Sequence, residues 1–165
     1  LYKPQPVILI KPVVPTSEKQ AQTWRYTTQE PDGAWYSTGF DDSSWQAGPG
    51  GFGTRSTPGA VVGTQWNRDE IWLRRTFQLN SSVSVEHLQL RIHHDEDAQV
   101  YINGVKALDT SGYVTDYLEL QLSPAARETL QAGENTLAVH CRQTAGGQFI
   151  DVGLVEVVEK PAKGQ

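Results

Sequence analysis

The sequence predicts an all-β fold, a β-sandwich of about eight antiparallel strands with one short helix. Apolar and polar residues alternate in several runs, as expected for strands with one buried face. Residues that favour strands are frequent, and 15 glycines and 9 prolines fall mostly between the apolar runs. The length of 165 residues and a hydrophobic content of 38% suit one domain with its own core.

The first 22 residues predict a proline-rich linker. Prolines at positions 4, 6, 12 and 15 flank the apolar run 7–10, which suits an extended segment with one edge strand. We expect the sandwich to occupy residues 23–159 and a polar tail to occupy residues 160–165. Since the chain has no methionine and no signal peptide, we expect it to be a piece of a longer polypeptide.

The next segments predict a strand and a long loop. Residues 23–28 favour a strand, which the tight-turn sequence Pro31-Asp32-Gly33 closes. Residues 38–54 are rich in Gly, Asp and Ser and predict a loop that aromatic side chains attach to the core. These aromatic residues are Phe40, Trp45 and Phe52.

Four further strands alternate clearly. In residues 71–79 the alternation turns Ile71 and Leu73 inward and Trp72 outward. Residues 88–94 and 98–102 repeat the pattern, and Asn103-Gly104 is the preferred pair for a type I′ hairpin turn into a returning strand. Residues 117–122 give one more alternating run.

The predicted helix covers residues 123–133. Ser123 is a typical N-cap, a proline follows at the first helical position, and Gly133 fits the C-terminal end. Two strands, 135–143 and 149–157, complete the expected fold and turn Cys141 into the core as a small apolar residue.

The composition excludes several classes of protein. The net charge of −5 argues against a nucleic-acid partner, which needs clustered basic residues. The longest apolar run has four residues, so no membrane partner is expected. A single cysteine excludes an internal disulfide and a cysteine-rich zinc site.

Six segments in order resemble a known family: FDDSSW, IWLRRTFQL, DEDAQVYING, GYVTDYLELQL, LQAGENTLAV and GGQFIDVGL. Over about residues 24–157 the chain resembles the galactose-binding-domain-like jelly roll, and in particular the sugar-binding domain of family 2 glycoside hydrolases such as β-galactosidases. The resemblance implies a non-catalytic sandwich within a larger enzyme whose catalytic glutamates lie on a separate barrel. A barrel of roughly 250 residues does not fit beside the sandwich in this chain.

Strand directions predict a ligand site at one end of the sandwich, called end A here. Antiparallel pairing brings the segments 65–70 and 93–97 there, and the family's topology adds 142–148. An aromatic platform with polar side chains suits a sugar. The candidate ligand-binding residues are Trp66, Asn67, Arg68, Asp69, His94, Asp95, Arg142 and Gln143. We expect Trp66 and Trp72 to be exposed, and Trp24, Trp35 and Trp45 to be core or loop anchors.

The acidic corner Asp95-Glu96-Asp97 has several interpretations. Glycosidic catalysis needs two carboxylates across the scissile bond, about 5 Å apart or roughly 6.5–9.5 Å apart, and adjacent corner residues seldom meet this requirement. We expect turn capping and solvation instead, and no cofactor. The alternative is a structural calcium ion, which related sandwiches often carry, with Asp95 and Asp97 as its candidate ligands. His93 and His94 face opposite sides of their strand and cannot chelate one metal together.

The sequence therefore predicts a non-catalytic, carbohydrate-binding module of a larger extracellular or periplasmic glycoside hydrolase. Its expected partners are a glycan or oligosaccharide, bound weakly at end A, and the catalytic domain of the same polypeptide. Two alternatives stay open. One is a purely structural interdomain module with no ligand of its own, and the other is a small free-standing hydrolase that uses the acids of residues 93–97.

Overall fold

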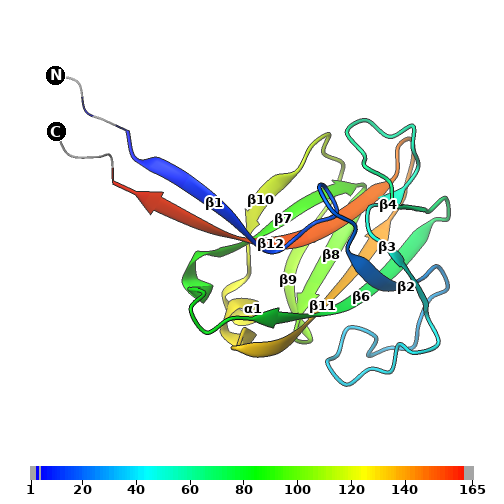
Figure 1. The fold of residues 1–165 in the computed structure, drawn as a ribbon. Coiled ribbons are helices and arrows are strands. Elements are labelled where there is room, and N and C mark those ends of the chain that lie inside the picture. The colour runs from blue at the N-terminus through cyan, green and yellow to red at the C-terminus, as the bar shows by residue number, and fades with distance from the viewer. Residues whose placement is uncertain (1–2, 4, 162–165) are drawn as a thin grey trace.

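The computed structural model describes residue 3 and residues 5–161, which form two packed six-stranded sheets (Figure 1). Apart from the parallel pair β4–β5, neighbouring strands run antiparallel. The first sheet has the order β10-β7-β12-β4-β5, with β1 also on β12, and the second has the order β3-β2-β6-β11-β8-β9. The predicted all-β sandwich is confirmed.

The strands of the first sheet are β1 (Val7–Val14), β4 (Phe52–Gly53), β5 (Thr64–Gln65), β7 (Leu88–Asp95), β10 (Leu118–Gln121) and β12 (Phe149–Lys160). Those of the second are β2 (Thr23–Thr27), β3 (Gln46–Pro49), β6 (Glu70–Leu79), β8 (Asp97–Ile102), β9 (Val105–Thr110) and β11 (Gly133–Arg142). One 3-10 turn (Val85–His87) and one helix, α1 (Pro124–Thr129), complete the described elements. No helix in this part of the chain is long and apolar enough to cross a membrane.

The core lies between the two sheets and follows the predicted alternation. Leu73 of β6 and Val139 of β11 face Ile92 of β7 and Val152 of β12, and all four are fully buried in one cluster. Cys141 is buried there too, as expected. The hydrophobic surface that these strands remove from water is the main source of the fold's stability.

A long loop between β2 and β3, residues 28–45, covers the outer face of the second sheet. Arg74 of β6 holds it there: the guanidinium donates to the carbonyls of Trp35 and Ser37 at 2.6 and 2.8 Å and pairs with Asp42 at 2.9 Å. Trp72 lies under the same loop and is only 4% exposed. The expectation that Trp72 is exposed is therefore wrong, because its outward side of the sheet is covered.

The local turn and cap signals hold, with one difference. Asn103 and Gly104 have positive φ angles of 50° and 83°, as a type I′ turn requires. Ser123 accepts a hydrogen bond from the Ala126 amide at 3.2 Å and caps α1. The helix ends at Thr129, however, and Gly133 does not stop it. Gly133 has a φ of 92° and begins β11 instead.

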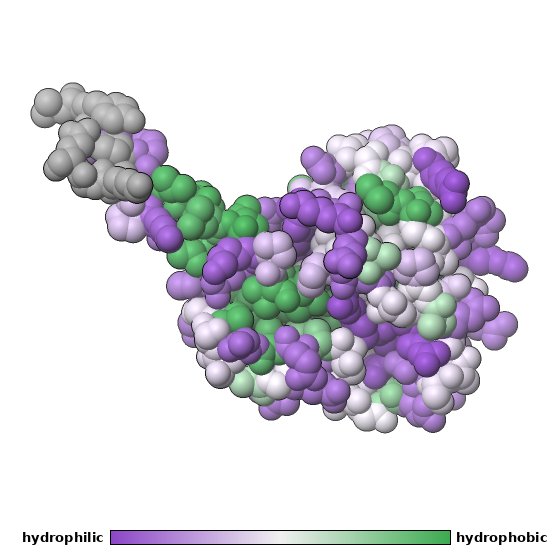
Figure 2. All heavy atoms as spheres, viewed as in Figure 1, coloured by the Kyte–Doolittle hydropathy of each residue, from purple (hydrophilic) through white to green (hydrophobic). Residues whose placement is uncertain are grey.

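Strands β1 and β12 form an arm that extends away from the sandwich (Figure 1). Strand β1 of the arm lies within the predicted linker, residues 1–22. Strand β12 continues to Lys160, the first residue of the predicted tail. Val7, Ile8 and Ile10 are exposed on it, and the apolar surface continues onto the body (Figure 2). Residues 1–2, 4 and 162–165 lie outside the described part of the chain.

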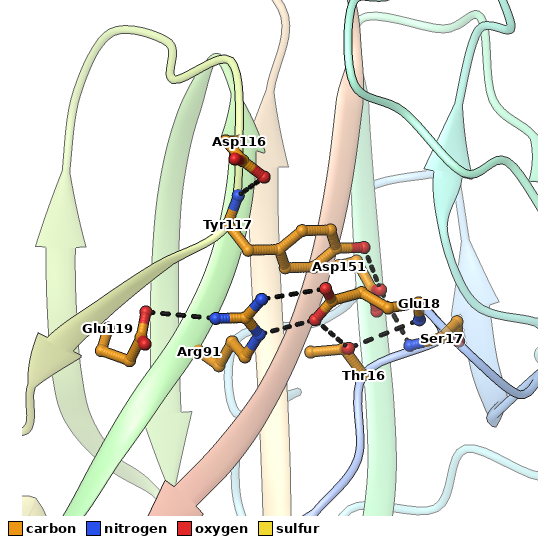
Figure 3. Close-up of polar contacts among 8 residues, drawn as sticks. All are labelled: Thr16, Ser17, Glu18, Arg91, Asp116, Tyr117, Glu119 and Asp151. Carbon is orange, nitrogen blue, oxygen red and sulfur yellow. Dashed lines mark hydrogen bonds and ion pairs between the residues drawn. The ribbon is translucent and has the colours of Figure 1, made fainter. Parts of the chain in front are cut away.

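An ion-pair network fixes the connection between β1 and β2 onto the outer face of the first sheet (Figure 3). Arg91 of β7 donates to both carboxylate oxygens of Glu18, at 2.6 and 2.9 Å, and to Glu119 of β10 at 3.2 Å. The bidentate pair lowers the pKa of Glu18. Residues 15–22 are thereby attached to two neighbouring strands.

Asp151 of β12 anchors the same connection beside the ion pair (Figure 3). It is 1% exposed and accepts hydrogen bonds from the Tyr117 hydroxyl at 2.6 Å and the Ser17 amide at 2.9 Å. Burial raises the pKa of Asp151 to about 6, although both hydrogen bonds act to lower it. The anchor thus contains a carboxylate that is costly to ionise.

Gly153 allows the connection to cross β12 closely, and we predict that Gly153→Ala destabilises the fold. A Cβ there would overlap the Val14 carbonyl oxygen and lie 2.9 Å from the Thr16 amide nitrogen. Because both are backbone atoms, we expect a loss of about 2–3 kcal/mol in urea unfolding. Gly39→Ala is the control, since nothing lies within 4 Å of that position. Equal stabilities of the two variants would contradict the packing.

Asp151 makes a second prediction, on pH. Its pKa rises from 3.8 to about 6 on folding, so the folded state holds the proton more tightly. The contribution of Asp151 to stability is complete below pH 4 and falls by on the order of 3 kcal/mol as the pH rises through 6. Asp151→Asn keeps an acceptor for Tyr117 and Ser17 but removes this titration. Denaturation of both proteins from pH 4 to 7 tests it, and parallel pH profiles would refute it.

Candidate ligand-binding site

Three loops meet at end A, as strand direction predicts for two of them and the family's topology for the third. In the strand register, Arg142 of β11 lies opposite Glu70 at the start of β6 on one side and opposite Asp97 at the start of β8 on the other. At the same end, Asp95 closes β7 opposite Phe149 of β12. The segments 66–69, 95–97 and 143–148 are therefore neighbours in space.

The predicted aromatic platform is absent from this end. Trp66 is 2% exposed, belongs to the core cluster, and donates its indole N–H to the Glu70 carbonyl at 3.2 Å. The expectation of an exposed Trp66 is wrong, because the residue turns into the sandwich where β6 begins. The three tryptophans expected to be anchors do pack as expected. Trp24 lies in the main core, and Trp35 and Trp45 lie in the cluster under the 28–45 loop.

Most of the other predicted residues lie at the rim of end A. Asn67, Arg68, Asp69 and Arg142 are exposed, and Gln143 is half-buried. Hydrogen bonds to backbone carbonyls connect the segments of this rim. The Gln143 amide donates to the Asp69 carbonyl at 2.7 Å, and the Gln148 side chain donates to the Arg68 carbonyl at 2.5 Å. None of these residues lines the cavity at this end. Their predicted ligand-binding role stays a prediction.

His94 is buried and hydrogen-bonded, as its inward position predicts. Its Nδ1 lies 2.8 Å from the Glu96 carbonyl oxygen and 3.1 Å from that of Gly112. The ring is 2% exposed, so its contacts are with the protein. Its neighbour His93 is fully buried as well, but it contacts the Val114 carbonyl and the Phe149 ring.

A cavity of about 450 Å³ opens at end A. Its walls come from four segments: Pro58, the corner 95–96, the loop 113–115 and the loop 144–147. This volume falls in the range of small-ligand pockets. Of the predicted site residues, Asp95 alone contributes to the lining.

Asp95 presents a carboxylate with no partner. It is 6% exposed, and no hydrogen bond in the described residues ends on its side chain. Burial, and then the neighbouring charge of Glu96, raise the pKa of this carboxyl. Gly147 makes room for it, since a Cβ at that position would lie 2.7 Å from Oδ2 of Asp95. The carboxylate thus keeps its hydrogen-bonding capacity free.

The other two acids of the corner have structural partners. Glu96 accepts hydrogen bonds from the Thr144 hydroxyl and from the Ala145 amide, the latter at 2.9 Å, and so joins the 95–97 corner to the 143–148 loop. Asp97 accepts from the Gly112 amide at 2.8 Å. Glu96 and Asp97 therefore bond to loops that are distant in sequence and not to the backbone of their own corner.

Tyr113 supplies an aromatic surface that the sequence did not single out. It is 67% exposed at one wall of the cavity. Backbone pairing holds this wall against the end of β7. Asp95 and Tyr113 form an isolated antiparallel β-bridge, and the Val114 amide donates to the His94 carbonyl at 3.0 Å. The signal in the sequence was weak, because the loop 111–117 showed no sign of which end it occupies.

The described residues contain no group of three or more His, Cys, Asp or Glu side chains that could hold a metal ion. Calcium takes about six to eight oxygen ligands, and one of the two candidate carboxylates, that of Asp97, already accepts a backbone amide. The calcium ion at Asp95 and Asp97 stays a prediction without support from the side chains.

Comparison with known proteins identifies the fold. No protein-family model and no curated protein matches the chain. Among solved structures, a β-glucuronidase from Bacteroides uniformis aligns with a TM-score of 0.56 at 20% identity, over 92% of this chain and 18% of its own. A family 2 glycosyl hydrolase from Bacteroides cellulosilyticus aligns at 0.58 and 14% identity, over 83% of this chain and 20% of its own.

A third structure, a β-glucuronidase from Ruminococcus gnavus, aligns with a TM-score of 0.58 at 10% identity, over 95% of this chain. The fold and these alignments define the chain as a β-sandwich domain. More particularly, it has the fold of a domain present in family 2 glycoside hydrolases, which confirms the sequence resemblance at the level of fold. The chain spans only 18–30% of the length of these matched chains.

The unpartnered carboxylate predicts an unusual response to mutation. Asp95→Asn removes a buried charge that nothing compensates, so we expect a gain of roughly 0.5–1 kcal/mol in unfolding free energy at pH 7. Asp97→Asn is the matched control, and it should lose about 0.5–1 kcal/mol because it weakens a charge-assisted bond to the Gly112 amide. Chemical denaturation measures both. A loss of stability in Asp95→Asn would show that its carboxylate has a partner.

Proposed function

We propose that the chain is a non-catalytic module of a larger glycoside hydrolase and that it binds a glycan in the cavity at end A. The observation that carries this proposal is the pairing of exposed Tyr113 with the unpartnered carboxylate of Asp95 in one cavity. An aromatic ring packs against the apolar face of a sugar, and a carboxylate accepts hydrogen bonds from its hydroxyl groups.

The larger enzyme is inferred from the structural comparisons. The matched structures are a family 2 glycosyl hydrolase and two β-glucuronidases, and each is several times longer than this chain. A module of such an enzyme would meet its glycan outside the cytoplasm, so we place it in the extracellular space or the periplasm. Its second partner would be the catalytic domain of the same polypeptide.

The chemistry of the cavity supports binding rather than hydrolysis. Its two carboxylates come from adjacent residues, Asp95 and Glu96, and Glu96 uses both oxygens to hold the 143–148 loop. Glycosidic hydrolysis requires two carboxyl groups on either side of the bond, one of them free to donate a proton. The carboxyl groups of adjacent residues do not flank a bond in this way, and Glu96 has no oxygen free to take part.

The arm favours a second role, that of a structural interdomain module. Val7, Ile8 and Ile10 are exposed on β1, with exposed fractions of 46–64%. A neighbouring hollow of about 490 Å³ continues the apolar surface at the base of the arm, lined in part by Pro12, Val14 and Val155. A neighbouring domain of the same polypeptide would cover this surface.

Replacement of Tyr113 tests glycan binding. A glycan array with the 165-residue chain selects a ligand, and titration calorimetry then compares variants. We expect Tyr113→Ala to weaken binding at least tenfold, because the packing surface is lost, and Tyr113→Phe to retain it. Both variants should fold as the parent does, since the side chain is exposed. Absence of binding to any glycan would reject this role and leave the structural one.

A further inference from the structure

The cavity at end A has a marked charge preference. Its lining contains two carboxylates, Asp95 and Glu96, and no Lys, Arg or His side chain. A ligand with a carboxylate of its own would be a third negative group in a partly desolvated site, where repulsion is stronger than in water. The cavity therefore disfavours acidic sugars.

The two carboxylates differ in whether they already have hydrogen-bond partners. Glu96 is satisfied by Thr144 and Ala145. Asp95 is more than nine-tenths buried, lines the cavity, and has neither a donor nor a cation among the described residues. Its oxygens are not among the buried atoms without a partner, so they reach the cavity, where a donor or a cation of a ligand would pair with them.

We propose that the glycan recognised at end A contains an amino sugar whose free ammonium group pairs with Asp95. An ammonium offers one positive charge and three donors to an acceptor-only carboxylate. Tyr113 on the cavity wall presents a ring that attracts both a sugar face and a cation. The inference rests on the proposed function, since it names the sugar class for the same cavity. It also implies that sugars with a carboxylate, such as uronic acids, are poor ligands for this cavity.

The test compares sugars that differ in one group. The probes are β-1,4-linked trisaccharides of glucosamine, N-acetylglucosamine and glucose, together with an oligoglucuronate, titrated into the whole chain at pH 6.5. We expect glucosamine trisaccharide to bind at least tenfold more tightly than its N-acetylated counterpart, because acetylation removes the charge. Raising the salt concentration should reduce this preference. The oligoglucuronate should bind least.

Two variants locate the preference. Asp95→Asn should reduce it to less than about threefold while retaining binding of the neutral sugars. Glu134→Gln removes an exposed acid of β11 that does not line the cavity and should leave the preference unchanged. This control separates a specific pair from the general attraction of a chain with net charge −5.

Each remaining outcome is decisive. Equal binding of glucosamine and N-acetylglucosamine trisaccharides, tight binding of oligoglucuronate, or a preference that survives in Asp95→Asn would overturn the amino-sugar inference and leave glycan binding intact. If none of these probes and no glycan on the array binds, the proposed function itself fails.

Discussion

The register of β11 between β6 and β8 is the constraint on which end A depends. Arg142 lies opposite Glu70 on one side and Asp97 on the other, so the loops that follow these strand ends must meet. The same register buries Leu137 and Val139 between the sheets. A slip of one residue would turn these side chains out of the core, and the hydrophobic effect forbids it. The core and the cavity are thus consequences of one pairing.

Much of the fold could be predicted because its signals are local. Alternation identified the long strands, and the type I′ turn at Asn103-Gly104 follows from the φ angles that two residues adopt. The convergence of segments 65–70 and 93–97 at end A followed from strand direction, and that of segment 142–148 from the topology that the resemblance implies. The burial of side chains on the outer faces of the sheets could not be predicted from the alternation. Trp72, for example, is covered by a loop that Arg74 holds against the second sheet through long-range hydrogen bonds. Tyr113 was missed for the same reason, because non-local bonds decide where its loop lies.

Three aspartates show how partners rather than residue type determine a role. Asp97 accepts one amide and closes a turn. Asp151 is buried deepest, accepts a hydroxyl and an amide, and fixes the connection between β1 and β2. Asp95 is almost as buried but has no donor in the described residues. Among the described residues this charge therefore has no structural role that its hydrogen bonds reveal, unlike the charges of the other two.

The arm has a consequence for how the protein associates with other chains. Beyond the sandwich, β1 and β12 pair with each other and with no other described strand, so the ribbon presents open backbone edges. Such edges can accept an added strand from a second molecule. On the ribbon itself, Glu159 and Lys160 of β12 place charges beside the open edge, and charged side chains on an edge discourage strand addition. The ribbon therefore carries its own protection against uncontrolled strand addition.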